Sequence, residues 1–327
     1  MTILITGAAG FIGFHAARAL LDRGETVIGI DNLSDYYDVN LKKARLARLE
    51  EHGNFTFERL DIADLGAMLE FSQANKGIGR VLHFAAQPGV RYSLVNPYAY
   101  VSANVSGHLN VVEMCRRFDK LTHLVYASSS SVYGGNAKLP FAVGERADQP
   151  ASLYAVTKRC DELVSFCYSH LYRLPMTGLR FFTVYGPWGR PDMAAYLFTR
   201  AIFNGEVIRV FNRGDMKRDF TYIDDATEGV LICLDHPPAA EGRAPPHAVY
   251  NIGHHEAEPL KRFIEVIEKA VGRKAKLKLV PMQPGEVKET YADITATQKD
   301  LGFNPSTSID VGVPRFVDWY RDYHGVS

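Results

Sequence analysis

The sequence predicts an α/β fold in which a doubly wound parallel sheet is joined to a smaller C-terminal α/β lobe. Short apolar segments alternate with helical patterns from the N-terminus to Phe181, and this alternation is typical of parallel β-α-β units. Beyond Phe181 the alternation ends, and Pro187 and Pro191 punctuate shorter elements. The 327 residues suffice for one large α/β unit or for two fused lobes.

Six apolar segments are expected to form the strands of the sheet, with helices between and after them. The strands are Thr2–Thr6, Glu25–Ile30, Phe55–Leu60, Arg80–Phe84, Thr122–Ala127 and Met176–Phe181. The helices are Phe11–Asp22, Leu41–Leu49, one capped by Asp64, Ala99–Phe118, Leu153–Tyr172, Asp224–Asp235, Leu260–Val271 and Ile309–Tyr320. We expect residues 1–183 to form the larger domain, with 216–245 returning to it. Residues 184–215 and 246–327 are expected to form the lobe over the carboxyl edge of the sheet.

Charge and cysteine content exclude several classes of partner. Basic and acidic residues balance at 37 each, so no net positive field attracts nucleic acid or an anionic membrane. The four cysteines form no C-x-x-C pair, which argues against a zinc site and suits a reducing compartment. No apolar run approaches the ~18 residues that span a bilayer, and the N-terminal segment lacks the features of a signal peptide. We therefore expect a cytoplasmic protein. His254-His255-Glu256 lacks an evident third ligand, so no metal site is expected.

A glycine-rich segment, Gly7-Ala-Ala-Gly10-Phe-Ile-Gly13, lies between the first strand and the first helix. Gly7 permits a tight turn, Gly10 lets a pyrophosphate approach the helix N-terminus, and Gly13 allows close helix–strand packing. Three glycines also occur in ordinary strand–helix turns, but Asp31 ends the second strand, where an acid binds ribose hydroxyls. Because its charge repels a 2′-phosphate, the sequence predicts a Rossmann-type domain that binds NAD rather than NADP.

Further cofactor contacts are expected at strand ends and at the start of the first helix. They are Phe11, Ile12, Asn32, Asp61, Ile62, Ala85, Ala86, Asn104, Ser128 and Phe181. Asp61 follows the third strand, where a carboxylate can accept from the adenine amine. Lys42, Lys43 and Arg45 are expected to form a solvated helix face.

Tyr154-Ala-Val-Thr-Lys158 puts a phenol and an ammonium on the same face of a helix. A tyrosine ordinarily titrates near ~10, and a fixed positive charge stabilises its phenolate, so this pair can act as a base and also contact the cofactor. Such a pair can also occur by accident on an exposed helix. The serine run Ser128–Ser131 at the same sheet edge argues against that, and Ser129 can share the substrate proton.

These motifs resemble those of the extended short-chain dehydrogenases that act on nucleotide sugars. Three longer segments, 31–37, 87–93 and 182–193, are similar to UDP-glucuronate 4-epimerases in particular. The resemblance implies tightly held NAD that is recycled in each turnover. It also implies that Tyr154 takes the 4-hydroxyl proton while hydride leaves C4, and that hydride returns to the opposite face of a 4-keto sugar.

The resemblance also separates related reactions. Dehydratases of the superfamily have Asp and Glu at the positions of Ser130 and Ser131, and the decarboxylases have Glu at the Ser131 position. Serine offers no proton chemistry at neutral pH, so both reactions are disfavoured. Thr183 lies where UDP-galactose epimerases have Asn. Ser130, Ser131 and Thr183 are therefore candidate donors to a substrate carboxylate.

The substrate implied by the resemblance is a UDP-sugar, with Arg218 on the diphosphate and Arg190 near the sugar. Val90 and Arg91 are expected to line the sugar pocket, and Glu286 to orient Arg218, while Gln283 departs from galactose-type relatives. Each arginine could instead form a surface ion pair. Ala99–Phe118 and Leu153–Tyr172 resemble the helices through which relatives form homodimers, although they could equally cover the sheet of a monomer.

Other functions remain open. A UDP-glucose/UDP-galactose or N-acetylhexosamine 4-epimerase is the main alternative, and a UDP-glucuronate decarboxylase is less favoured. A non-catalytic NAD-binding module is disfavoured by the intact pair of Tyr154 and Lys158. A dehydrogenase of small alcohols is disfavoured by Arg190 and Arg218, because such a substrate needs no diphosphate grip.

Overall fold

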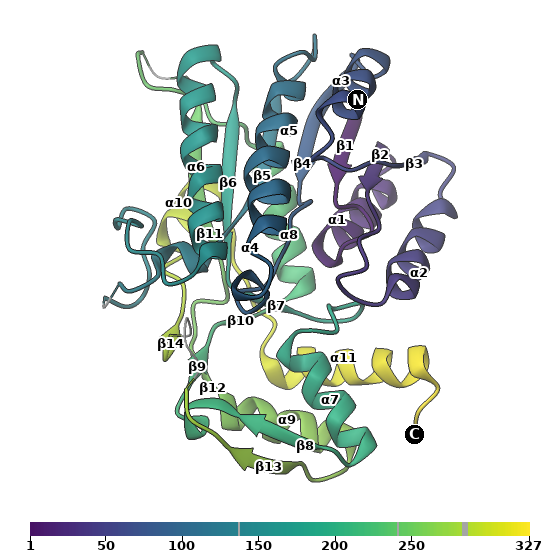
Figure 1. Cartoon of the computed structure of the whole chain (residues 1–327), viewed down its shortest axis with the longest axis vertical. Helices are drawn as coiled ribbons and strands as arrows, with labels where there is room; N and C mark the ends of the chain where they lie inside the picture. The colour runs from purple at the N-terminus through teal and green to yellow at the C-terminus, as the bar shows by residue number, and fades with distance from the viewer. Residues whose placement is uncertain (137, 241, 283–286) are drawn as a thin grey trace.

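A seven-stranded parallel sheet forms the larger part of the molecule, and a smaller lobe packs at one end of it (Figure 1). The computed structural model describes residues 1–136, 138–240, 242–282 and 287–327. The strand order is β11-β6-β5-β4-β1-β2-β3. The strands are β1 (Thr2–Thr6), β2 (Thr26–Asp31), β3 (Phe55–Arg59), β4 (Ile78–His83), β5 (His123–Ser129), β6 (Met176–Phe181) and β11 (His247–Ile252). The order reverses between β1 and β4, which is where ligands bind in doubly wound sheets.

Helices cover both faces of this sheet, because the side chains of β1 are buried on both sides. Ile3 and Ile5 belong to one core cluster, and Leu4 between them belongs to the other. The first face carries α1 (Phe11–Asp22), α2 (Val39–Glu50) and α8 (Ile223–Asp235). The second face carries α3 (Leu65–Ala74), α5 (Gly107–Cys115) and α6 (Leu153–Tyr172). The expected fold class is therefore confirmed.

The helix expected over Ala99–Phe118 is interrupted. The chain forms α4 (Pro97–Tyr100), a π-helical segment (η2, Val101–Ser106) and then α5. Asn96 caps α4 through the N–H of Ala99, and Pro97 is the first helical residue, so the helix begins earlier than periodicity alone indicates. The wider π-turn is a feature that apolar periodicity does not encode.

The boundary of the smaller lobe also differs from the expectation. Residues 246–327 were expected to lie in that lobe, but β11 pairs with β6 in the register His247↔Met176 and completes the main sheet. Most side chains of β11 are only partly buried, as suits an edge strand, and this weakens its apolar pattern. The helix α8 packs against α1 and β5.

The smaller lobe contains three long helices and short strands. The helices are α7 (Ala194–Asn204), α9 (Leu260–Val271) and α11 (Ile309–His324). The strands are β8 (Val207–Val210) with β13 (Lys276–Leu279), and β9 (Lys217–Arg218) with β12 (Glu258–Pro259) and β14 (Glu289–Thr290). Strands β7 (Thr183–Tyr185) and β10 (Phe220–Tyr222) pair where the two parts meet, and α10 (Thr295–Leu301) contacts β11. Among the described segments, no helix combines the length and apolar character needed to cross a membrane.

Candidate functional site

The turn from β1 into α1 is packed so tightly that only glycine fits at positions 7 and 13. Gly7 has a φ of +73°, and a Cβ there would lie 2.7 Å from the backbone nitrogen of Ala85. A Cβ on Gly13 would lie 2.1 Å from the carbonyl oxygen of Gly7. Within the described chain, no side chain caps the N-terminus of α1, whereas Asp38, Asp64 and Ser152 cap α2, α3 and α6. Backbone N–H groups at this end of α1 therefore fit the pyrophosphate of a dinucleotide.

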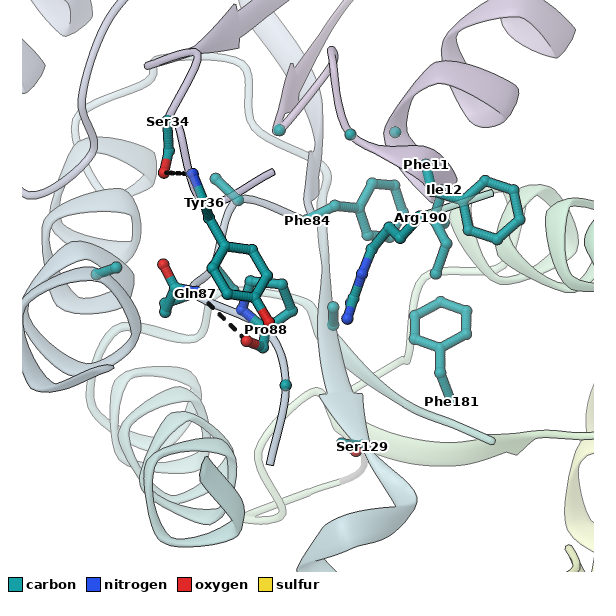
Figure 2. A pocket seen from close by; sticks show the side chains of 18 of the residues that line it. Phe11, Ile12, Ser34, Tyr36, Phe84, Gln87, Pro88, Ser129, Phe181 and Arg190 are labelled. Carbon is teal, nitrogen blue, oxygen red and sulfur yellow. Dashed lines mark hydrogen bonds between the residues drawn. The ribbon is translucent and has the colours of Figure 1, made fainter. Parts of the chain in front are cut away.

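A cavity of about 440 Å³ runs along the carboxyl ends of the strands beside this loop (Figure 2). It contains nearly all the residues expected at the cofactor: Gly7, Gly10, Phe11, Ile12, Gly13, Asp31, Asn32, Asp61, Ile62, Ala85, Ala86, Ser128, Tyr154, Lys158 and Phe181. In Figure 2, Arg190 reaches into the space between Phe181 and Tyr36. The structure thus brings together groups from six strand ends.

Asn104 is the expected cofactor residue that the structure does not bring to the cavity surface. Its side chain is buried, accepts from the N–H of Gln87 at 2.7 Å, and donates to the carbonyl of Gln87 at 3.1 Å and to Thr157 Oγ1 at 3.0 Å. Asn104 therefore fixes the loop at Gln87, which itself lines the cavity. Asn104 lies in the π-helical segment η2, where the wider turn changes which side chains share a helix face. The apolar pattern of the sequence does not reveal such a turn.

Lys42 and Arg45 do not form the solvated face that helical spacing suggested; of that group only Lys43 is exposed. Lys42 lines the cavity, with its Nζ 4.0 Å from Asp31 Oδ1 and over the ring of Tyr37. Burial lowers the pKa of Lys42. Burial raises the pKa of Asp31, against the opposing effect of Lys42.

Arg45 is fully buried because its guanidinium joins three segments. It donates to the carbonyl oxygens of Ala9 and Trp188 and to the hydroxyl of Tyr37. The inner face of α2 thus holds the glycine-rich loop, the loop after β2 and the smaller lobe together. Helical periodicity predicted that this face of α2 is exposed. It is buried because segments from other parts of the chain pack over it.

The expected catalytic residues come from α6 and from the end of β5. Ser152 caps α6 by accepting from the N–H of Ala155, so Tyr154 lies in the first turn of the helix, and Lys158 one turn later. Lys158 Nζ donates to the carbonyl of Ala127 and to Asp161 Oδ2, at 2.9 Å each. Ser129 ends β5, and all three expected residues line the same cavity.

A second cavity of about 850 Å³ adjoins the first and is lined largely by residues of the smaller lobe. The two share eight lining residues: Tyr36, Gly89, Val90, Ser130, Ser131, Thr183, Arg190 and Met193. Arg91 and Arg218 line the second cavity only. The structure therefore brings the expected substrate residues to one continuous space. Glu286 and Gln283 lie outside the described residues.

The arginines of this space are held by specific partners. Arg190 donates to both carboxylate oxygens of Asp192, at 3.0 and 2.7 Å, and the hydroxyl of Tyr36 donates to the same carboxylate at 3.1 Å. Arg218 donates to the backbone carbonyls of Lys217, Val287 and Lys288. The guanidinium of Arg91 lies 4.6 Å from the ring centroid of Phe211.

Comparison with known proteins places this site in a family. The model of the NAD dependent epimerase/dehydratase family matches residues 3–253. The chain belongs to this family. It is 45% identical to UDP-glucuronate 4-epimerase 4 of Arabidopsis thaliana, over 99% of this chain and 76% of that protein. The crystal structure of UDP-glucuronic acid 4-epimerase from Bacillus cereus, in complex with UDP-glucuronic acid and NAD, has a TM-score of 0.88 and 35% identity, covering 99% and 100% of the two chains.

Fold alone does not separate the substrates of the epimerase/dehydratase family. UDP-glucose 4-epimerase of Thermotoga maritima, solved with UDP-glucose, also has a TM-score of 0.88, at 27% identity and with 99% and 100% coverage. The comparisons confirm the expected resemblance, the enzyme class and NAD as the cofactor. The sugar preference has to be argued from the side chains in the two cavities.

Each acid of this epimerase/dehydratase site either comes from a strand remote from β5, is engaged by an arginine, or belongs to the smaller lobe. In the described ranges, the carboxylates lining the two cavities are Asp31, Asp61, Asp192 and Glu206. Asp31 and Asp61 follow β2 and β3, on the far side of β1 and β4 from β5. Asp192 is held by Arg190, and Glu206 immediately precedes β8 in the smaller lobe.

Several lining residues were missed by the sequence reasoning, among them Tyr36, Lys42, Phe84, Gln87, Asp192 and Phe211. Tyr36 and Gln87 lie inside the longer segments that carry the family resemblance, so those segments could have indicated them. His254 and His255, rejected as metal ligands, donate their backbone N–H groups to Asp219 at 2.7 and 3.0 Å.

Proposed function

We propose that this chain is an NAD-dependent UDP-glucuronate 4-epimerase, which interconverts UDP-glucuronate and UDP-galacturonate through a transient 4-keto sugar. One observation carries the proposal: the cavity with Tyr154, Lys158 and Ser129 opens into the arginine-lined cavity at Ser130, Ser131 and Thr183. A base therefore lies beside neutral hydroxyl donors, with cations beyond them. The family membership and the identity to UDP-glucuronate 4-epimerases support this assignment.

The cofactor contacts follow from the smaller cavity. NAD, when bound, supplies reversible hydride transfer at C4. The loop from Gly7 to Gly13 and the N-terminus of α1 hold its pyrophosphate, and the carboxylate of Asp31 accepts from the adenosine ribose. Asp61 lines the same cavity after β3, and its carboxylate is assigned to the adenine amine. Lys158 has a third N–H beyond the two already engaged, and this donor suits the nicotinamide ribose.

Tyr154 is assigned the role of transferring the proton. Its phenolate accepts the proton of the 4-hydroxyl as C4 is oxidised and returns it after the sugar turns over. Lys158 stabilises the phenolate through its positive charge, and Ser129 shares the proton as a hydrogen-bond partner. The reaction needs one base that acts in both directions, which matches a site with one such tyrosine.

The uronate carboxylate is assigned to Ser130, Ser131 and Thr183. The 4-keto form of the substrate is a β-keto acid, which loses carbon dioxide when its breaking bond aligns with the ketone. Neutral donors hold the carboxylate in one orientation without supplying a proton to the ring. Asp31 and Asp61 follow strands remote from β5, and the carboxylate of Asp192 is engaged by Arg190 and Tyr36. Together these features favour epimerisation over decarboxylation or dehydration.

The uridine diphosphate is assigned to the larger cavity, where Arg91, Arg190 and Arg218 supply positive charge. A direct test is incubation of the purified protein with UDP-glucuronate, with the products identified by NMR. UDP-galacturonate is the expected product. Turnover of UDP-galactose without any reaction of UDP-glucuronate would instead support the neutral-sugar epimerase, and carbon dioxide as the main product would support the decarboxylase.

We further infer that the protein is a cytoplasmic homodimer. Leu163, Phe166 and Leu171 on α6 and Val101 and Leu109 on the neighbouring helical segment are all substantially exposed. An exposed apolar face of this kind supports pairing with a second copy. Four cysteines without a disulfide among them support a reducing compartment.

A further inference from the structure

Beneath the cavity, Lys158 forms an ion pair with a residue that the sequence motifs do not include. Its Nζ lies 2.9 Å from Asp161 Oδ2 and 2.9 Å from the carbonyl oxygen of Ala127. The side chains of Lys158 and Asp161 are 5% and 1% exposed. Two of the three ammonium donors are therefore engaged on the protein side, which leaves the third for the cavity.

A gain in folding stability does not explain the buried charge of Asp161. Burying two charges costs much of what their attraction returns, and uncharged residues of similar volume are often equally stable in such places. Asp161 Oδ1 has no hydrogen-bond partner within the described chain, so its carboxylate is only half satisfied. An unsatisfied buried polar atom has a free-energy cost, which indicates that this charge serves another purpose.

The other titratable groups around the pair do not compensate Lys158. His108 on α5 and His83 on β4 have pKa values lowered by burial, and both are neutral at neutral pH. Burial raises the pKa of Tyr126 on β5. Glu162 on α6 is engaged by Arg180 and Arg159. Asp161 is therefore the anion that faces Lys158 from the protein side, opposite Tyr154.

We propose that Asp161 is a positioning residue for the epimerisation, which orients the Lys158 ammonium and sets how strongly its charge acts on the Tyr154 phenol. This inference rests on the proposed function. The negative charge of the Asp161 carboxylate partly cancels the positive charge of the Lys158 ammonium. Tyr154 therefore experiences less than a full positive charge from Lys158. Asp161 also keeps Lys158 protonated, because its attraction opposes the effect of burial and the pKa of Lys158 is raised overall.

The substitution Asp161→Asn tests the effect of the Asp161 charge separately from the effect of the size of its side chain. Asparagine has nearly the same volume and still accepts a hydrogen bond from Lys158, but it carries no charge. Lys158 then acts uncompensated on Tyr154, so the phenolate forms at lower pH. Lys158 itself loses its proton more easily, because it remains buried without an anion. Both limbs of the pH profile of kcat are therefore expected to move to lower pH.

The decisive measurement uses the NAD-bound protein without substrate. Tyrosine is labelled with carbon-13 at the ring carbon that bears the hydroxyl, and the Tyr154 resonance is assigned by its absence in Tyr154→Phe. Its titration midpoint is expected to fall by about 1 unit in Asp161→Asn, as for a charge removed at this range in a buried site. Glu113→Gln is the matched control, because it removes a carboxylate on α5 that pairs with Arg116 and Arg117 just beyond the end of that helix, outside the cavities. It is expected to leave the midpoint unchanged.

Two results would overturn the proposal. One is an unchanged midpoint together with an unchanged pH profile in folded Asp161→Asn, which would make Asp161 merely structural. The other is a midpoint that moves upward. Should Asp161→Asn not fold, Asp161→Ala removes the same charge with less volume and carries the same expectation. Since the titration needs no sugar, it is independent of the substrate, whereas the proposed function fails if the unmodified protein forms no UDP-galacturonate.

Discussion

Lys42 lies beside Asp31 at the adenosine end of the cofactor cavity, with 4.0 Å between Lys42 Nζ and Asp31 Oδ1. The two side chains are 8% and 9% exposed, so their charges act in a poorly solvated place. The carboxylate repels a 2′-phosphate, while the ammonium would attract one. The preference for NAD over NADP therefore depends on whether the Asp31 carboxylate or the Lys42 ammonium lies closer to the 2′ position of the ribose.

Asp31→Asn is expected to shift this preference toward NADP. Removal of the carboxylate leaves Lys42 as the charge nearest the ribose, and the affinity for NADP relative to NAD should rise about tenfold, or about 1.4 kcal/mol. Calorimetric titration of the apoprotein with each dinucleotide measures the ratio. Adding Lys42→Met should reverse the gain, and a ratio that Asp31→Asn leaves unchanged would exclude this role for the pair.

Tyr154→Phe is expected to lower turnover by a factor of at least about 100 while the protein still binds NAD. Phenylalanine keeps the ring but cannot accept the 4-hydroxyl proton, and general-base catalysis contributes a factor of this size or more. Turnover of UDP-glucuronate and the bound NAD of the purified protein are the two measurements. Tyr98→Phe, an exposed tyrosine outside both cavities, serves as the control. Full activity in Tyr154→Phe would remove the residue from the proposed mechanism.

The sequence predicted the parts of the site that are local in the chain. Gly7 to Gly13 form one turn, and Tyr154 and Lys158 are one helical turn apart, so their spacing alone defines their geometry. Lys42 could not be placed in this way, because its neighbour Tyr37 and the buried Arg45 form a surface that only tertiary packing creates.

The sequence pattern also did not predict the edge strand β11 or the π-helical segment η2. The strand β11 carries only two fully buried side chains, Asn251 and Ile252, so its pattern lacks the apolar run of a central strand. Asn104 lies in the π-helical segment η2 and bonds Gln87 and Thr157, and its contact with the cofactor stays a prediction. Neither feature follows from a regular period of 2 or 3.6 residues.

Thr183→Val is expected to weaken binding of the uronate selectively. Valine keeps the shape but loses the hydroxyl assigned to the carboxylate, and a hydrogen bond to a charged group contributes about 1.5 kcal/mol. KM for UDP-glucuronate should therefore rise about tenfold. Thr199→Val is the matched control, because Thr199 is fully buried and its Oγ1 has no hydrogen-bond partner in the described chain. An unchanged KM in Thr183→Val would assign the carboxylate to other residues.

Glu162→Gln is expected to destabilise the protein by about 3 kcal/mol, since it leaves Arg180 buried without its anion. Glu162 accepts from Arg180 at 2.8 and 2.9 Å and from Ser128 at 2.6 Å, and its side chain is 2% exposed. Burial opposes its ionisation, but hydrogen bonds and the charge of Arg180 outweigh burial and hold the pKa below its usual value.

The sign of the pH dependence follows from that lowered pKa. The stabilisation by Glu162 is fully present above the pKa of glutamate in the unfolded chain, about 4.3, and is lost as pH falls through the lower folded value. Urea unfolding should therefore show the largest difference between the unmodified protein and Glu162→Gln near neutral pH, and a smaller one in acid. A difference that grows as the pH falls would contradict this account of the pair.

Phe166→Lys combined with Leu163→Lys is expected to convert the proposed homodimer into a monomer. The two side chains are 50% and 56% exposed and lie one turn apart on α6, so two charges would enter the centre of the inferred interface. Each apolar side chain contributes about 2 kcal/mol when it is fully buried, and burying an unpaired ammonium adds a further cost. Light scattering measures the mass, and Leu279→Lys, at an equally exposed position in β13, controls for added charge. A dimer that survives the double substitution would place the interface elsewhere, and a monomeric unmodified protein would exclude this assembly altogether.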